Sequence, residues 1–137
     1  MSTVMAGTPH YVLMEGNRRI GPKVLPLPSG TECAPIYGFS NQRPYETFRR
    51  NSELALTPYP LVKVYLRSQD DESGDDLKLV IVDAAGPREP CLRAATIEAV
   101  LQAHENRTNQ VTTAYRLMFD QEANAYRVDE SPSRGVD

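Results

Sequence analysis

The chain has 137 residues, of which 40% are hydrophobic and 24% are charged, and its formal net charge is −3. These values are typical of one soluble domain that can bury a sizeable core. The acidic balance argues against nucleic acid and anionic membranes as partners, because both attract basic surfaces. No stretch approaches the ~20 apolar residues that span a bilayer. Residues 1–7 lack the basic start and apolar run of a signal peptide, so we expect a cytoplasmic protein without membrane contact.

The first third of the chain predicts short strands joined by turns. Residues 1–9 show no periodicity and are expected to form a flexible tail. Residues 11–14 and 34–39 are short apolar runs that predict strands. Residues 20–27 predict an edge strand or an extended connection, because their prolines lack the N–H group that a strand ladder needs.

A first helix is predicted over residues 43–54. Ser40 offers an N-cap oxygen before it, and Pro44 is compatible with the first helical turn. The helix is expected to end before the prolines at 58 and 60, since residues that precede proline avoid the α region. The spacing places three side chains on one face that is expected to be buried: Tyr45, Phe48 and Ser52.

The centre of the chain predicts two strands separated by an acidic loop. Residues 61–67 alternate between apolar and other side chains, which is typical of a half-buried strand. Residues 69–76 are polar and acidic and predict the loop. Residues 77–82 are apolar on both faces apart from Lys78, which predicts a central strand that is covered on both sides and buries Ile81.

A second, almost entirely apolar helix is predicted from residue 90 to about residue 104. Its main stripe, which includes Leu101, is expected to lie in the core. A second stripe runs along nearly the opposite side, so the helix either lies between two layers of the domain or contacts a partner. This second stripe is the candidate interface: Leu92, Ala95, Ala99 and Ala103.

The C-terminal part predicts a β-hairpin. Residues 112–120 alternate, residues 121–124 have turn chemistry, and residues 125–129 return. Residues 131–137 are polar and predict a flexible tail. The mixture of strands and helices without regular alternation predicts the α+β class, with a mixed or mostly antiparallel sheet and two main helices in a single domain over residues 10–130.

Asp83 is the one candidate catalytic residue, at the carboxyl end of the predicted central strand. Such positions often carry the chemistry of α/β proteins, so Asp83 is a weak candidate for a general base or a ligand contact. The alternative, which we favour, is that its carboxylate caps the turn at residues 84–86 or the following helix.

The sequence predicts no metal or cofactor. The acidic side chains of residues 70–76 lack the spacing of a calcium loop, so we expect a solvated loop. The two histidines, His10 and His104, do not form a zinc motif, and His104 is expected to be a hydrogen-bonded histidine at the edge of the core. Cys33 and Cys91 lack metal or redox spacing and are expected to be buried free thiols. Neither a GxGxxG motif nor a Walker loop occurs.

Arginine and tyrosine side chains are concentrated in the first half of the chain. Arg18, Arg19 and Lys23 lie near one predicted turn, Arg43, Arg49 and Arg50 lie on the first predicted helix, and Tyr37, Tyr45 and Tyr59 are close to them in sequence. Such residues could form a surface for an anion or a peptide, since arginine and tyrosine are frequent in interfaces. The alternative, which we favour, is ordinary solvated arginines with packed tyrosines. The candidate binding set on and after the first helix comprises Arg43, Tyr45, Arg49, Arg50 and Tyr59.

One short segment resembles a known family. Residues 34–40, followed by Tyr45 and Phe48, are similar to the strand–Phe–Thr/Ser–helix segment of the SseB-type secretion-enhancer family. The resemblance covers a small part of the chain, so it implies neither an activity nor a set of site residues.

The leading functional hypothesis is a non-enzymatic interaction or accessory module that associates as a homodimer and contacts a protein partner. It follows from the two-sided helix, from the arginine- and tyrosine-rich first half and from the lack of a catalytic constellation. The alternative is a small-molecule-binding protein or enzyme that uses Asp83 with arginine and tyrosine residues of the first helix. A concave pocket that joins such residues would favour the alternative.

Overall fold

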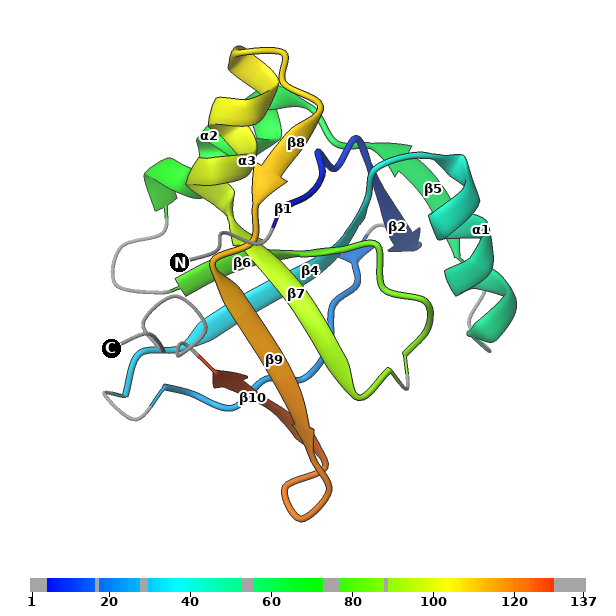
Figure 1. The fold of residues 1–137 in the computed structure, drawn as a ribbon, viewed down its shortest axis with the longest axis vertical. Coiled ribbons are helices and arrows are strands. Elements are labelled where there is room, and N and C mark those ends of the chain that lie inside the picture. Colours follow the sequence, from blue (N-terminus) through cyan, green and yellow to red (C-terminus); the bar gives the residue numbers. More distant parts are fainter. Residues whose placement is uncertain are drawn as a thin grey trace.

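The computed structural model describes residues 5–16, 18–27, 30–52, 56–72, 77–87 and 89–129 (Figure 1). Within them lie three helices, namely α1 (Gln42–Asn51), α2 (Lys63–Glu72) and α3 (Ile97–Glu105). The strands are β1 (Met5–Gly7), β2 (Tyr11–Glu15), β3 (Arg18–Arg19), β4 (Cys33–Phe39), β5 (Thr57–Pro60), β6 (Leu77–Val82), β7 (Cys91–Thr96), β8 (Gln110–Thr112), β9 (Tyr115–Asp120) and β10 (Ala125–Asp129). No helix in this part of the chain is long and apolar enough to cross a membrane.

The main sheet has the strand order β10-β9-β7-β6-β4-β2-β3, and β5 also pairs with β2. Strand β6 pairs in parallel with β4 and antiparallel with β7, whereas the other pairs between described strands of this sheet are antiparallel. The α+β class and the mixed sheet are therefore confirmed. So are the central strand, the C-terminal hairpin and the burial of Ile81 and Leu101, which are 0% and 8% exposed.

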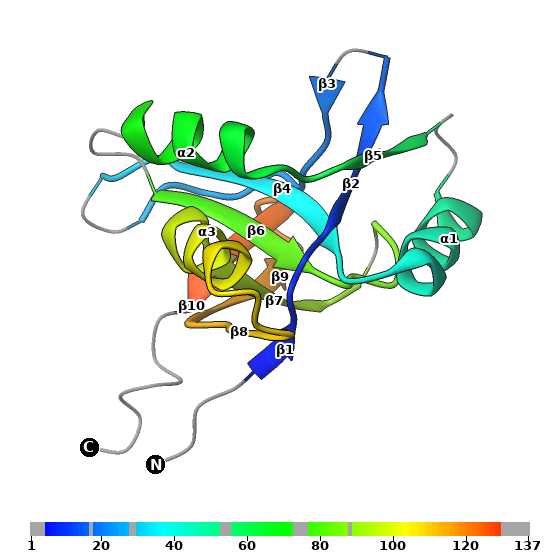
Figure 2. The same cartoon turned by 90° about the horizontal axis from the view of Figure 1, so that it is seen from above.

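One face of the sheet is covered by α2 and α3, which pack against each other (Figures 1 and 2). We call this the helix face. Its core is aliphatic because the inward side chains of β2, β6 and β7 meet those of the two helices. Its buried members are Val12, Leu61, Leu66, Val80, Ala95, Ile97, Val100, Leu101, Ala103 and Val111.

The opposite face, which we call the pocket face, is covered by α1 and by the connection over residues 20–27. Phe48 of α1 is buried against the rings of Tyr37 and Phe39. At one end of the connection, the backbone N–H of Tyr37 in β4 donates to the carbonyl of Ile20. Near the other end, the N–H of Leu25 donates to the carbonyl of Tyr126 in β10, and Val24 forms a parallel bridge with Tyr126. The connection therefore spans from β4 to β10 on the side of the aromatic core.

Gly21 permits this close approach of the connection to β4. A Cβ atom at Gly21 would lie 2.0 Å from the carbonyl oxygen of Pro35, which is far inside van der Waals contact. The extended connection expected from the prolines is present, and only Val24 in it forms a bridge within the described residues.

The prediction of a strand over residues 61–67 is wrong, because residues 63–72 form helix α2. A short apolar run does not distinguish a strand from a helix by period alone. Leu66 is the buried residue that fixes α2 on the sheet, while Val64, which supported the alternation, is 75% exposed. The prolines that were expected only to end a helix instead occupy β5, an edge strand that pairs with β2.

The prediction of a helix that begins at residue 90 is wrong for the first half of that helix. Residues 91–96 form strand β7 between β6 and β9, and α3 begins at Ile97. Alanine has the highest helix propensity, but Ala94 and Ala95 are placed in the sheet by pairing and burial. The side chain of Thr96 then caps α3 by accepting a hydrogen bond from the N–H of Ala99 at 3.0 Å.

The N-terminal segment also differs from expectation. Residues 5–7, assigned to a flexible tail, form β1 and pair with β8, and the buried Thr8 hydroxyl donates to the carbonyl of Thr108. The expected tail over residues 131–137 lies outside the described residues, as do residues 1–4. The N-cap of α1 is Asn41 rather than Ser40, because the Asn41 side chain accepts from the N–H of Arg43.

Candidate functional site

A pocket of about 560 Å³ opens on the pocket face, beside the β2–β3 hairpin. This volume is within the range of about 300–1,000 Å³ that is usual for small-molecule sites. Its walls come from both ends of the chain, because the connection over residues 20–27 pairs with β10. The residues that define its chemistry are Arg18, Lys23, Tyr37, Phe48, Asn124 and Tyr126.

Two tyrosines from opposite ends of the chain line the pocket, and both are only 4% exposed. The hydroxyl of Tyr126 donates to the backbone carbonyl of Glu89. The hydroxyl of Tyr37, in contrast, forms no hydrogen bond with any described residue. Its ring packs against Phe48, with the ring centroids 4.5 Å apart.

Both phenols are held in the protonated form. Burial raises the pKa of Tyr37 well above its ordinary value, and the neighbouring Tyr126 and Glu89 raise this pKa further. Burial also raises the pKa of Tyr126, with smaller contributions from Glu89 and Cys91. Each phenol is therefore a neutral hydrogen-bonding group at physiological pH rather than a base.

Cationic side chains line the pocket at the β2–β3 hairpin and just after it. Arg18 forms an exposed ion pair with Glu15, its register partner across the hairpin, at 2.9 Å. Lys23 is exposed on the connection. Arg19 lines the pocket as well, but its guanidinium lies over the ring of Tyr65 on α2, 3.6 Å from the ring centroid. Arg18 and Lys23 are therefore the cations best placed to meet a ligand.

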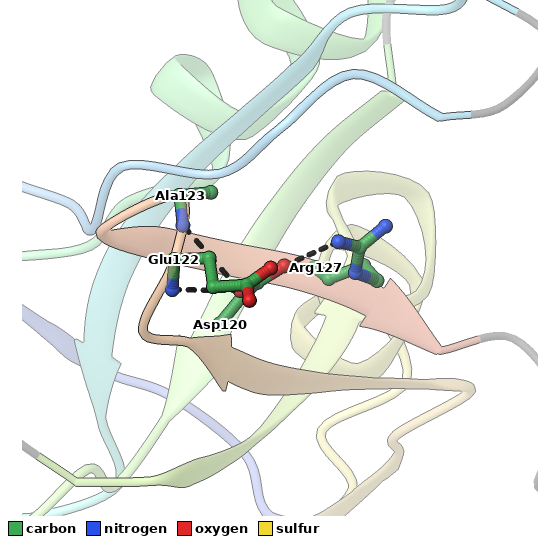
Figure 3. A network of polar contacts seen from close by, with 4 residues as sticks. All are labelled: Asp120, Glu122, Ala123 and Arg127. Carbon is green, nitrogen blue, oxygen red and sulfur yellow. Dashed lines mark hydrogen bonds and ion pairs between the residues drawn. The ribbon is translucent and has the colours of Figure 1, made fainter.

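The β9–β10 hairpin supplies another wall, and its turn is fixed by Asp120 (Figure 3). One carboxylate oxygen of Asp120 accepts hydrogen bonds from the backbone N–H groups of Glu122 and Ala123, at 3.0 and 3.4 Å, and the other accepts from Arg127. The hydrogen bond from Arg127 is the main reason that the pKa of Asp120 is lowered. This network holds the turn that contains Asn124, which lines the pocket with a positive φ of 53°.

Asp83 lies outside this pocket and joins β6 to the start of α1. One carboxylate oxygen accepts from the backbone N–H of Ser40 and the other from the Ser40 hydroxyl, both at 2.7 Å. The residue has a positive φ of 54°, and its own N–H donates to the carbonyl of Gly38. Asp83 therefore caps a segment 43 residues earlier in the chain, not the turn or helix that follows it.

A smaller pocket of about 360 Å³ does include Asp83, together with Glu89, Cys91 and Arg93. It contains none of the first-helix arginines that the alternative hypothesis combined with Asp83. Cys91 is exposed rather than buried, because it lies on an outward position of β7. Cys33 is half-buried, and burial raises the pKa of its thiol to about 11.

The predicted binding set does not converge on one site. Arg43 and Arg50 lie together on the outer side of α1, with Glu46 and Thr47. Arg49 is exposed in the last turn of that helix. Tyr45 is half-buried and its ring meets Tyr11 at 5.5 Å, while Tyr59 is exposed on β5.

The candidate interface is likewise divided. Leu92 lies in the core of the pocket face, whereas Ala95 and Ala103 are buried in the core of the helix face. Ala99 is half-buried against that second core. Because strand β7 replaces the first half of the predicted helix, these four residues do not form one helical stripe.

The two histidines meet, although they are far apart in sequence. Their ring centroids are 5.0 Å apart, and Nε2 of His104 donates to the carbonyl of Pro9 at 2.6 Å. The hydrogen-bonded histidine expected at this position is therefore present. Within the described residues, no group of three or more histidine, cysteine, aspartate or glutamate side chains is placed to hold a metal ion. Asp75 and Asp76 of the acidic loop lie outside those residues, and the side chains of Asp70, Asp71 and Glu72 are likewise not described.

The sequence did not single out the residues of this pocket as one site. Arg18, Arg19, Lys23 and Tyr37 were grouped with the arginines and tyrosines of the first helix as one possible anion or peptide surface, and the candidate binding set was placed on and after that helix. Tyr126 was missed because it joins them only through the pairing of β10 with the connection. Comparison with protein-family models, curated proteins and solved structures finds no match to this chain.

Proposed function

We propose that this domain is a non-enzymatic binding module that holds an anionic ligand with an apolar part in the pocket of Tyr37 and Tyr126. The observation that carries the proposal is the combination of Arg18 and Lys23 with a buried aromatic lining. The lining combines aromatic rings with polar and charged groups in similar measure, so it suits a ligand that is apolar in part, and the cations favour a negatively charged group.

The ion pair between Arg18 and Glu15 is compatible with ligand binding. The pair is exposed, with 76% and 37% of the two side chains accessible to solvent. Exposed ion pairs contribute about 0–1 kcal/mol, so an incoming anion can replace Glu15 at low cost. Arginine also binds carboxylates and phosphates through two parallel hydrogen bonds, which gives the ligand a fixed orientation.

The lining favours recognition over catalysis. Proton transfer at neutral pH works best with groups that titrate near that pH, and the two phenols of the pocket are held protonated. Asp83, the candidate base of the alternative hypothesis, has both carboxylate oxygens hydrogen-bonded to Ser40. The expected homodimer rested on the helical stripe, whose residues the fold divides between two cores, so self-association is not included in the proposal.

The test is an NMR titration of the ¹⁵N-labelled protein with benzoate, benzyl alcohol and benzylamine, which share a ring and differ in charge. Benzoate should shift the amide resonances of Lys23, Asn124 and Tyr126 at lower concentration than the other two. The double variant Arg18→Gln/Lys23→Gln should weaken benzoate binding. The matched control Arg43→Gln/Arg50→Gln removes two positive charges from α1 and should leave binding unchanged.

Two results would contradict the proposal. One is equal binding of benzoate and benzylamine, which would show that charge does not matter. The other is equal weakening of benzoate binding by both double variants, which would show that only the net charge of the protein matters.

A further inference from the structure

The hydroxyl of Tyr37 is a polar group for which the described fold provides no hydrogen-bond partner. The residue is 4% exposed and lines the pocket, and its hydroxyl oxygen is not among the described buried side-chain atoms that lack a partner, so the hydroxyl is open to the pocket. A hydroxyl that is open to a pocket can be solvated there, so it remains available to form a hydrogen bond with a ligand. A phenylalanine would fill the same space in the core but would offer no donor to the pocket.

The second tyrosine of the pocket, Tyr126, differs from Tyr37 in its hydrogen bonding. Both tyrosines line the same pocket and are equally buried, but Tyr126 already donates its proton to the carbonyl of Glu89. The donor of Tyr37 is available, and the phenol remains protonated at neutral pH. The interior of the pocket can therefore donate a hydrogen bond to a ligand atom through Tyr37.

The surrounding side chains favour an aromatic ring beside this donor. Phe48 is buried against Tyr37, and Phe119, which is 40% exposed, packs edge-on against Tyr126. Aromatic rings prefer offset and edge-to-face contacts with one another, and both arrangements are open to a ring that enters between these walls. The cavity has room for one substituted ring.

We propose that the ligand is a hydroxylated aromatic carboxylate whose phenol reaches Tyr37 and whose carboxylate meets Arg18 and Lys23. This inference rests on the proposed function and adds the chemical class of the ligand. The same chemistry has two sources, a free aromatic acid and a C-terminal tyrosine of a peptide, since both carry a phenol and a carboxylate.

The experiment compares 4-hydroxyphenylacetate with phenylacetate, by NMR titration of the native protein and of Tyr37→Phe. The native protein should bind the hydroxylated acid about three- to tenfold more tightly, which is the gain expected from one hydrogen bond. Tyr37→Phe should abolish this preference while keeping the affinity for phenylacetate, which also shows that the variant is folded. The matched control Tyr59→Phe removes an exposed hydroxyl on β5 and should keep the preference.

The comparison in the native protein requires no variant. Equal affinity for the two acids would overturn the inference and leave the proposed function standing, whereas binding of neither acid would overturn both. A preference that persists in Tyr37→Phe would also overturn the inference.

A second pair of probes, a short peptide that ends in tyrosine and its amidated form, distinguishes the two sources. A short peptide that ends in tyrosine should bind more tightly than 4-hydroxyphenylacetate if the partner is a protein, and more weakly if the ligand is a free acid. Amidation of the peptide's terminal carboxylate should abolish its binding in either case, and retained binding would overturn the assignment of the carboxylate to Arg18 and Lys23.

Discussion

The two faces of the central sheet differ in what covers them. On the helix face, β6 contributes Val80 to an aliphatic core beneath two helices. On the pocket face, the neighbouring side chains Leu79 and Ile81 of the same strand join a core with several aromatic rings, beneath one helix and an extended connection. Alternate residues of one strand therefore belong to environments with different chemistry.

The comparison indicates a division of roles. Aliphatic side chains between a sheet and two helices can pack densely, so that face contributes stability. A single helix and an extended segment cover their face less completely and leave the pocket, with polar atoms of Tyr37 and Tyr126 in its lining. We expect substitutions on the helix face to change the free energy of unfolding, and those in the pocket to change ligand binding.

The largest effect is expected for Leu66→Ala, which removes a fully buried side chain between α2 and the sheet. Unfolding in urea should show a loss of about 2–5 kcal/mol, from lost burial and the cavity left behind. Tyr37→Phe on the pocket face should lose less than about 1 kcal/mol, because its hydroxyl has no partner among the described residues. Similar losses in the two variants would contradict the division of roles.

The next largest effect is expected for Asp83→Ala, which frees the start of α1 and so loosens the cover of the pocket face. The change removes two hydrogen bonds to Ser40 and leaves alanine at a positive φ, with an expected loss of about 2–4 kcal/mol. Asp83→Asn should lose less, since asparagine tolerates this backbone conformation and keeps one acceptor oxygen. If the asparagine variant were as unstable as the alanine variant, the charge of Asp83 would be the main factor.

Gly21→Ala is expected to disturb the pocket face alone. The new methyl group would overlap the carbonyl of Pro35, so the connection must move away from β4, at a cost of about 1–3 kcal/mol. Amide shifts should spread over Val24 and Tyr126 and leave Val100 of α3 unchanged. Shifts of equal size on α3 would show that the two faces are not independent.

The smallest effect is expected for the pH dependence of stability, through His10 and its neighbour His104 near the end of α3. Burial, and then the nearby His104, lower the pKa of His10 below the ordinary value of about 6.5 for histidine. The unfolded chain therefore binds a proton more readily than the folded one, so stability should be constant above about pH 6.5 and fall as the pH decreases below it. His10→Gln should reduce this dependence in urea unfolding at pH 7.5 and 5.5. An unchanged pH dependence would show that His10 is not its source.

The sequence pattern was sufficient to predict the elements whose own side chains show which faces are buried. Leu77–Val82 is apolar on both faces apart from Lys78 and rich in β-branched residues, which is typical of a covered strand, and the hairpin at residues 115–129 combines alternation with a polar turn. Residues 91–96 were misassigned because four of them, in an alanine-rich run, suit a helix, and only pairing with β6 and β9 makes them a strand. Residues 61–67 were ambiguous because a short apolar run fits a strand or a helix, and Val62 and Val64, which suggested alternation, remain exposed.

The residues of the candidate site could be grouped from the sequence only where they are close together in the chain. Arg18 and Lys23 are neighbours in sequence, so their grouping was visible. The partner of Asp83 was not visible, because Ser40 lies on a different element and the contact depends on where α1 begins. In the sequence, the arginines of α1 and those of the β2–β3 hairpin form similar groups. Only the fold shows that the two groups line different parts of the surface.

The bridge between Val24 and Tyr126 also bears on the order in which the chain folds. It joins residues about a hundred positions apart, so its formation closes nearly the whole chain into a loop. Loop closure of this length costs more entropy than formation of the β9–β10 hairpin, whose strands are close in sequence, so we expect the hairpin to form first. We expect the amides of Leu25 and Tyr126, which take part in this pairing, to become protected from hydrogen exchange later in refolding than those of β9. A ligand in the pocket would then bind only the last species to form, and would slow unfolding more than it accelerates folding.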